Sequence, residues 1–360
     1  MKIPDPLSTE IVAVLAALVI PALLVEPARR LALRHGLVER PARHRVFTQK
    51  RFVPRLGGVV VAAAALAPAV TVTGRLDVRL TTLLAGAATV SLLGLLRDLR
   101  RIRLPIGAAT HATMAFAVAV GDVRLRLIEP SWLDLVITML WVVGIANAFR
   151  VLDSTDGVLP TVTCATAVPL AASAFVIDQT ELALLLLCLA AACAGFLLHN
   201  APPARITMGD SGALCAGFFL AVSAAIVHSG HGSFVGLPIL MLITSVVAVD
   251  AVVVAVAGRD RGWVEDGPGR PTRLGFALGP NLLLVLLVLS TAGGGLLAVL
   301  VAGGVLPAAG TVAGALLVGT TLIVLLLQKP APAPPPQLPR IAERHVVAPA
   351  RTLVKEGAQR

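Results

Sequence analysis

The chain is built from apolar runs of roughly twenty residues, and these runs constrain its fold more than any other feature. An apolar helix of about that length crosses a hydrocarbon core about 30 Å thick. The composition agrees, because 57% of the 360 residues are hydrophobic and 14% are charged, whereas soluble domains are about 45–50% apolar and about 25% charged. A soluble globular chain is therefore excluded. The sequence predicts an all-α polytopic membrane protein.

About 11 transmembrane helices are expected, or 10 if one of the runs does not span. The predicted spans lie at residues 8–25, 56–73, 80–96, 105–120, 132–149, 158–176, 181–198, 210–228, 235–257, 279–302 and 306–327. Residues 1–328 are expected to form one multi-span domain. Residues 329–360, which begin with a Pro-rich stretch, are expected to form a disordered cytoplasmic tail.

Lys and Arg are distributed unevenly between alternate connections of this arrangement. One side carries 25 of the 30 basic residues and the other side carries 5. Because cytoplasmic loops are enriched in Lys and Arg, the sequence predicts an outside N-terminus and a cytoplasmic C-terminus. The net charge of +10 is explained by loops that face an anionic leaflet. Nucleic acid is not an expected partner, because aromatic residues make up 4% of the chain and Tyr is absent.

Four carboxylates, those of Asp98, Asp153, Asp156 and Asp210, fall at the predicted cytoplasmic ends of spans. Carboxylates near hydrocarbon are costly and usually have a function. Taken singly, each could be a helix cap or half of an ion pair. Taken together, and among arginines, they suit a Mg²⁺ ion shared with a diphosphate substrate. The predicted active face is cytoplasmic.

Two motifs carry a family resemblance. They are NAFRVLDSTDG at residues 147–157 and NAPPARITMGDSG at residues 200–212. The chain resembles the polyprenyl-phosphate N-acetylhexosamine-1-phosphate transferases, which include the phospho-N-acetylmuramoyl-pentapeptide transferase of peptidoglycan synthesis. Weaker similarities follow in the family's order. They are GLVERP (36–41), PRLGG (54–58), GLLRDLRRI (94–102), and Asp250 followed by RGWVEDGPGRPTRL (261–274).

The resemblance implies a reaction, in which a polyprenyl phosphate attacks the β-phosphorus of a UDP-N-acetylhexosamine and releases UMP. It implies a catalytic set of Asp98, Asp153 and Asp156. Asp153 and Asp98 would ligate Mg²⁺, with Mn²⁺ as an alternative. Asn147, Asn200 and Asp210 would bind substrate. The expected partners are the lipid phosphate, the sugar nucleotide and the membrane, and a homodimer is a further candidate assembly. The resemblance also implies a location in a bacterial inner membrane.

The chain departs from the family pattern at several of the positions that carry the chemistry. Arg97 and Arg101 replace acidic residues, and Arg150 replaces an Asn in the motif at 147–157. Gly269, Pro271 and Thr272 stand where histidines are expected. Arg cannot ligate Mg²⁺, although Arg97, Arg270 and Arg273 could bind phosphate.

Three functions follow. The protein is a divergent transferase whose arginines bind the diphosphate, or a catalytically silent homologue that binds lipid or nucleotide and regulates or scaffolds a pathway. A transporter that uses Asp250 is the least favoured. Transporters place polar groups near the bilayer midplane on broken helices, and Asp250 is the lone candidate for such a group and is already explained by the family resemblance.

Overall fold

The computed structural model describes residues 6–35, 38–39, 53–72, 77–99, 104–125, 131–153, 156–230 and 299–300. All of them belong to one compact unit, Met1–Lys329. The predicted tail at 329–360 lies outside the described residues. So do the predicted spans at 235–257, 279–302 and 306–327, except for residues 299–300.

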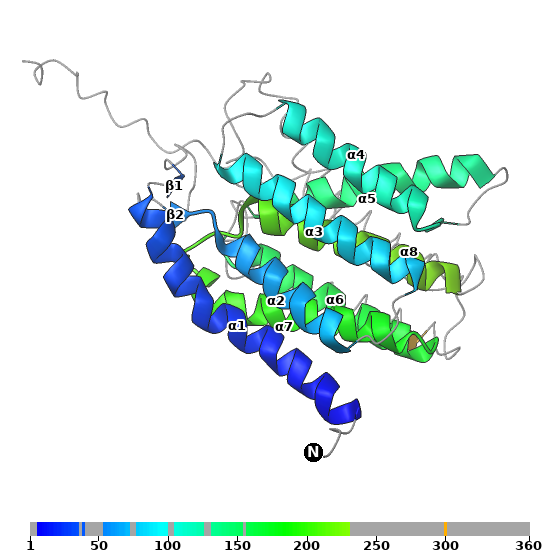
Figure 1. Ribbon diagram of the computed structural model, residues 1–360, viewed down its shortest axis with the longest axis horizontal. Helices are drawn as coiled ribbons and strands as arrows, with labels where there is room; N and C mark the ends of the chain where they lie inside the picture. The colour runs from blue at the N-terminus through cyan, green and yellow to red at the C-terminus, as the bar shows by residue number, and fades with distance from the viewer. Residues whose placement is uncertain are drawn as a thin grey trace, which may run out of the picture. The chain divides into compact units, whose positions relative to one another are not determined.

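The described residues form helices and one very short strand pairing (Figure 1). The helices are α1 (Pro6–Arg34), α2 (Gly57–Val72), α3 (Val78–Leu99), α4 (Leu104–Val120), α5 (Ser131–Leu152), α6 (Val158–Val176), α7 (Thr180–Asn200) and α8 (Gly209–Gly230). β1 (Val38–Glu39) pairs antiparallel with β2 (Val53–Pro54). The predicted all-α class is confirmed for the described residues, apart from this two-residue pairing.

Six helices in the described part of the chain are long and apolar enough to cross a membrane. They are Ser8–Arg34, Val78–Leu99, Trp132–Leu152, Val158–Val176, Thr180–Asn200 and Gly209–Ser229. Two shorter apolar stretches, Gly57–Ala67 and Ala109–Val120, lie within α2 and α4. These lengths and compositions are those of a multi-pass membrane protein. The total of eleven spans and their orientation stay predictions.

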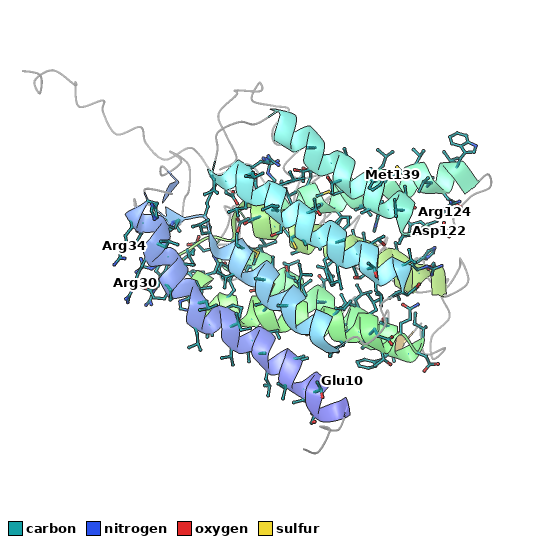
Figure 2. The ribbon with its side chains drawn as sticks, in the orientation of Figure 1. Glu10, Arg30, Arg34, Asp122, Arg124 and Met139 are labelled. Atoms are coloured by element: carbon teal, nitrogen blue, oxygen red, sulfur yellow. The ribbon has the colours of Figure 1, made fainter. Side chains whose placement is uncertain are left out.

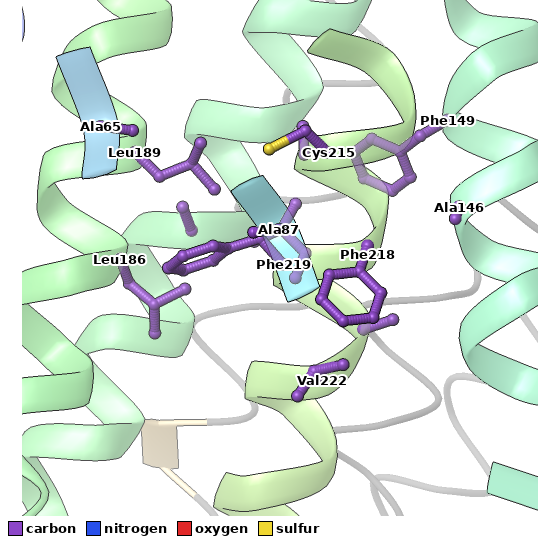
Figure 3. Close-up of a cluster of buried hydrophobic side chains, with 14 of the residues drawn as sticks. Ala65, Ala87, Ala146, Phe149, Leu186, Leu189, Cys215, Phe218, Phe219 and Val222 are labelled. Carbon is purple, nitrogen blue, oxygen red and sulfur yellow. The ribbon is translucent and has the colours of Figure 1, made fainter. Parts of the chain in front are cut away.

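Helix α8 is the central element of the packing. It packs against α3 and α5, and it also contacts α2 and α6. The 18-residue apolar window of α8 is entirely buried, as expected for a helix that is hydrophobic all round. Figure 3 shows Phe218 and Phe219 of α8 in one buried cluster with Leu186 of α7 and Phe149 of α5.

The remaining helices complete two groups around α8. Helix α7 packs against α1, α2 and α6, and α4 packs against α3 and α5. The outer side of α1 carries large apolar side chains that the protein leaves exposed, such as Val12 (62%) and Leu23 (66%). On a helix of this length such a surface suits lipid tails.

Glycines allow the first turn of α8 to approach α2 and α3 closely. A Cβ atom built on Gly94 of α3 would lie 2.6 Å from the Cα atom of Ser211. A Cβ atom built on Gly58 of α2 would collide with the backbone of Gly212. Because side chains at these positions would push the helices apart, the two glycines fix where the start of α8 sits.

Candidate active site

The first turn of α8 is bound by two carboxylates that come from distant parts of the chain. Asp98, in the last turn of α3, accepts the N–H of Asp210 at 3.1 Å and that of Ser211 at 3.0 Å. Asp153, directly after α5, accepts the N–H of Gly209 at 2.9 Å. The first N–H groups of a helix have no partner within the helix, and negative charge is favourable there. The two aspartates therefore fasten α8 to α3 and to the end of α5.

Gly209 makes this arrangement possible. Its φ of 75° lies in the left-handed region, which side chains other than Gly rarely adopt. A Cβ atom on this residue would lie 2.7 Å from Oδ2 of Asp98 and 2.9 Å from the carbonyl oxygen of Arg55. The position therefore requires glycine for its conformation and for its space.

Asp210 lies between two arginines from different helices. Its Oδ2 is 3.3 Å from Nη2 of Arg97 at the end of α3, and its Oδ1 is 3.0 Å from Nε of Arg150 in α5. All three side chains are mostly buried, with exposed fractions of 12% for Arg97, 28% for Arg150 and 15% for Asp210. Both oxygens of this carboxylate therefore bind guanidinium groups.

The connection between α7 and α8 is held by Asn200 and Asp156, which are both buried. Asn200 accepts the N–H of Gly157 at 3.0 Å and donates to the carbonyl oxygen of Ile206 at 2.8 Å. Asp156 accepts the N–H of Ala204 at 3.0 Å. These bonds join the start of α6 to both ends of the connection.

The same connection also pairs with the segment that precedes α2. Thr207 donates its N–H to the carbonyl oxygen of Pro54 at 3.0 Å. Gly57 and Gly58 donate to the carbonyl oxygens of Thr207 and Met208 at 3.2 and 2.8 Å. The segments PRLGG and NAPPARITMGDSG, about 150 residues apart in sequence, are therefore direct neighbours.

Asn147 lies in an interhelical contact between α4 and α5. Its Nδ2 is 2.8 Å from Nε2 of His111 and donates to the carbonyl oxygen of Val143 at 2.7 Å. Both side chains are partly buried. Asn147 thus links the two helices one turn before Arg150.

Comparison with known proteins finds a family match over the stretch that carries this site. Residues 80–228 match the model of glycosyl transferase family 4, and this stretch contains Asp98, Asp153 and Asp210. The chain belongs to this family. A relative from Streptomyces coelicolor, provisionally named a glycosyltransferase, is 36% identical over 69% of this chain and 58% of its own length.

Two further relatives have more specific names. One from Bacillus subtilis, provisionally named an undecaprenyl-phosphate N-acetylglucosaminyl 1-phosphate transferase, is 24% identical over 59% of this chain and 61% of its own length. A phospho-N-acetylmuramoyl-pentapeptide-transferase from Desulforudis audaxviator is 37% identical over 27% of this chain and 29% of its own length. The chain thus spans about three fifths of the first two relatives.

The structure places the predicted site residues of this family-4 chain in three groups. Asp98, Asp153, Asp210 and Arg97 meet at the first turn of α8, and Asp156 and Asn200 hold the connection that leads into it. Asn147 contacts α4 instead. Arg270 and Arg273, like Arg101, Gly269, Pro271, Thr272 and Asp250, lie outside the described residues.

Two residues of the site are not identified by the sequence. Arg150 stands out there only as a departure from the motif at 147–157, and Gly209 only as part of a motif. The change at position 150 from an expected Asn to a cation is the sequence feature that could have indicated a role for Arg150 in the site. The partner of Arg150 cannot be inferred, because Asp210 lies 60 positions away in the sequence.

The carboxylates differ in how well they suit Mg²⁺. No three His, Cys, Asp or Glu side chains converge as a metal cage among the residues that the structure describes. Mg²⁺ usually takes only one or two carboxylates and completes its shell with water and phosphate oxygens. Asp98 and Asp153, bonded to neighbouring amides, suit this mode. Asp210 does not, because two guanidiniums already bind its oxygens.

Proposed function

We propose that the protein transfers an N-acetylhexosamine-1-phosphate-type group from a UDP-sugar to a polyprenyl phosphate, in cell-envelope or glycoconjugate biosynthesis. An oxygen of the lipid phosphate forms a bond to the β-phosphorus of the UDP-sugar. The bond between that phosphorus and the bridging oxygen breaks, and UMP leaves with the electron pair. The product is a polyprenyl-diphospho-sugar.

One observation carries this proposal. Asp98 in α3 and Asp153 directly after α5 meet at the first turn of α8, where the guanidiniums of Arg97 and Arg150 bind Asp210. Phosphoryl transfer depends mainly on positioning and on charge stabilisation, and this cluster offers acidic and basic groups in a fixed frame. Membership of family 4 supports the same reaction class.

The site residues would have different roles in this reaction. Asp153 and Asp98 would hold Mg²⁺, or Mn²⁺, which when bound offsets the charge of the diphosphate. Arg97, Arg270 and Arg273 would bind phosphate oxygens. Asp156 and Asn200 position the connection before α8, and Asn147 and Asp210 would orient groups around the substrate. The apolar outer surfaces of the helices would accept the polyprenyl tail.

The test is release of UMP by the purified full chain. With Mg²⁺ and a polyprenyl phosphate, we expect UMP from at least one member of a panel of UDP-N-acetylhexosamines. Asp153→Asn should abolish release. Asp122→Asn is the control, because Asp122 is 66% exposed and lies in the turn after α4. Equal rates for Asp153→Asn and the wild type would refute the assigned role.

A second function, a catalytically silent homologue that binds ligand, is favoured by a specific observation. Both oxygens of Asp98 accept backbone N–H groups, and both oxygens of Asp210 bind arginines. The aspartates are thus already bonded as structural residues would be. Measurable nucleotide binding without UMP release across the whole panel would support this function over catalysis.

A further inference from the structure

We propose that Arg97 and Arg150, held together by Asp210, form a phosphate-binding site that takes the diphosphate of a nucleotide without a divalent cation. The proposal rests on the proposed function for its choice of ligand. It changes the expected role of Asp210 from a substrate-binding residue to a positioning residue for two arginines. It also gives Arg150, which the motifs alone did not assign, a place in the site.

The geometry favours binding of an anion by the arginines. A guanidinium has five N–H donors, and Asp210 contacts one nitrogen of each arginine. The N–H donors that do not contact Asp210 remain on each guanidinium, and paired guanidinium donors match the oxygens of a phosphate group. Because a carboxylate fixes both guanidiniums, little side-chain freedom is lost when a ligand binds.

Arg97 gives a second and independent indication. Its Nη1 atom is buried and has no hydrogen-bond partner among the residues that the structure describes. Leaving a buried charged donor unpaired is unfavourable, because the group loses its hydration and gains no partner. An anionic oxygen beside this guanidinium would satisfy the donor, whereas Asp210 alone leaves it unpaired.

The amides of α8 do not provide an alternative anion site. Helix N-termini often bind phosphate through free N–H groups. Here the N–H groups of Gly209, Asp210 and Ser211 already donate to Asp98 and Asp153. The cationic donors at this turn, in the described part of the chain, are therefore arginine side chains. Arg97 and Arg150 contact Asp210, and Arg55 lies near Asp98.

The charge balance explains why a cation would not be needed for binding. Arg55 lies close enough to Asp98 for their charges to interact. Three aspartates and three arginines therefore sum to 0, and the N-terminus of a helix contributes about +0.5. Without the arginines the same turn would hold three carboxylates and would repel a diphosphate. The arginines therefore offset the carboxylates at this turn, so a diphosphate meets fixed guanidinium donors without a net negative charge around them.

The experiment measures binding of UDP to the purified full chain in EDTA, with uridine as the probe that lacks phosphate. We expect UDP to bind and to raise the unfolding temperature, and uridine to do neither. Arg97→Gln and Arg150→Gln should each weaken UDP binding at least tenfold. Arg124→Gln should not, because Arg124 forms a comparable ion pair with Asp122 at 3.0 Å in the turn after α4.

Two more measurements separate loss of folding and binding of lipid from the proposed role. If the Gln variants unfold, Arg97→Lys and Arg150→Lys keep the charge but lose the paired guanidinium donors, and they should still weaken UDP binding. A polyprenyl phosphate compared with the matching polyprenol, in vesicles, tests whether the lipid phosphate uses the site instead. Lipid-phosphate binding that is lost in the variants, together with UDP binding that is unchanged in them, would assign the site to the lipid and overturn the nucleotide proposal.

The outcome is independent of catalysis. UDP binding in EDTA without UMP release would uphold the arginine site and reject the transferase. UMP release together with UDP binding that disappears in EDTA would uphold the transferase and reject the arginine site. Unchanged UDP affinity in both arginine variants would show that the arginines serve only as structural partners of Asp210.

Discussion

Asn200 shows how a single buried amide can set the shape of the site. Its side-chain oxygen accepts the N–H of Gly157, and its side-chain nitrogen donates to the carbonyl oxygen of Ile206. The position therefore requires a side chain that carries both an acceptor and a donor. Asn200→Asp keeps the shape but replaces the donor with an oxygen that faces a carbonyl. We expect a loss of about 1–3 kcal/mol in unfolding free energy, seen as a lower thermal midpoint in detergent. An unchanged midpoint would show that this bond contributes little.

Arg97→Asp tests whether the site has lost acidic groups or has been rebuilt around cations. The substitution removes the ion pair with Asp210 and places a new carboxylate near it, while Arg150 stays bound to Asp210. We expect UMP release to fall roughly tenfold or more, equivalent to about 1.4 kcal/mol of transition-state stabilisation. The rate of the purified variant, measured beside Arg97→Gln, gives the answer. A large gain in rate would mean that the site is simply degraded.

At the scale of residues, spacing in the sequence could indicate which carboxylates share an end of the helices. Asp98, Asp153 and Asp210 each follow or precede an apolar run, and the structure brings them to one turn. Their bonding partners could not be inferred, because the direction of a side chain across a helix interface depends on packing. The arrangement of Arg97 and Arg150 around Asp210 is the clearest example.

The approach of α8 to its neighbours belongs to the scale of elements. Gly94 lies where α3 meets the first turn of α8, and a Cβ atom there would be 2.7 Å from the carbonyl oxygen of Asp210. Gly94→Ala should therefore displace the turn and cost about 1–3 kcal/mol, as overpacking does. UDP binding and UMP release should both fall in the same variant.

Gly144 provides a matched control within α5. A Cβ atom on Gly144 would meet nothing within 4 Å, and Ala is a better helix former than Gly by about 1 kcal/mol. Gly144→Ala should leave activity unchanged and the thermal midpoint equal or slightly higher. If both variants lost activity equally, close approach at Gly94 would not explain the effect.

Hydropathy locates the helices well but not all of their ends. The predicted spans from 8–25 to 210–228 correspond in order to α1 through α8. Helix α1 nevertheless continues to Arg34, because Glu26 pairs with Arg29 and Arg30 along its surface. Apolar runs show where hydrocarbon contact ends, whereas polar residues can extend a helix beyond that point.

At the scale of the whole molecule, the two ends of the helices differ in charge and in chemistry. Figure 2 shows Arg30 and Arg34 at one end of the helices and Asp122 and Arg124 at the other. The cluster of aspartates and arginines at the start of α8 lies at the C-terminal ends of α3 and α5, which carry Arg97 and Arg150. The excess of basic residues predicts that this end faces the cytoplasm.

Cysteine labelling can test this orientation directly. The four native cysteines are Cys164, which is partly buried, and Cys188, Cys193 and Cys215, which are buried. They can be replaced by alanine to give a background without thiols. Arg34→Cys and Asp122→Cys then each place one exposed thiol at an opposite end. An impermeant maleimide added to intact cells should label residue 122, whereas residue 34 should react only after the membrane is opened.

The side of the membrane that holds the cluster decides which substrate can reach it. A sugar nucleotide is made in the cytoplasm, so an active site for it must open on the side that carries the basic residues. Labelling of residue 34 in intact cells would place the cluster of Asp98, Asp153 and Asp210 outside. Because a cytoplasmic UDP-sugar could not then reach the cluster, that result would remove both the predicted topology and the proposed transfer reaction.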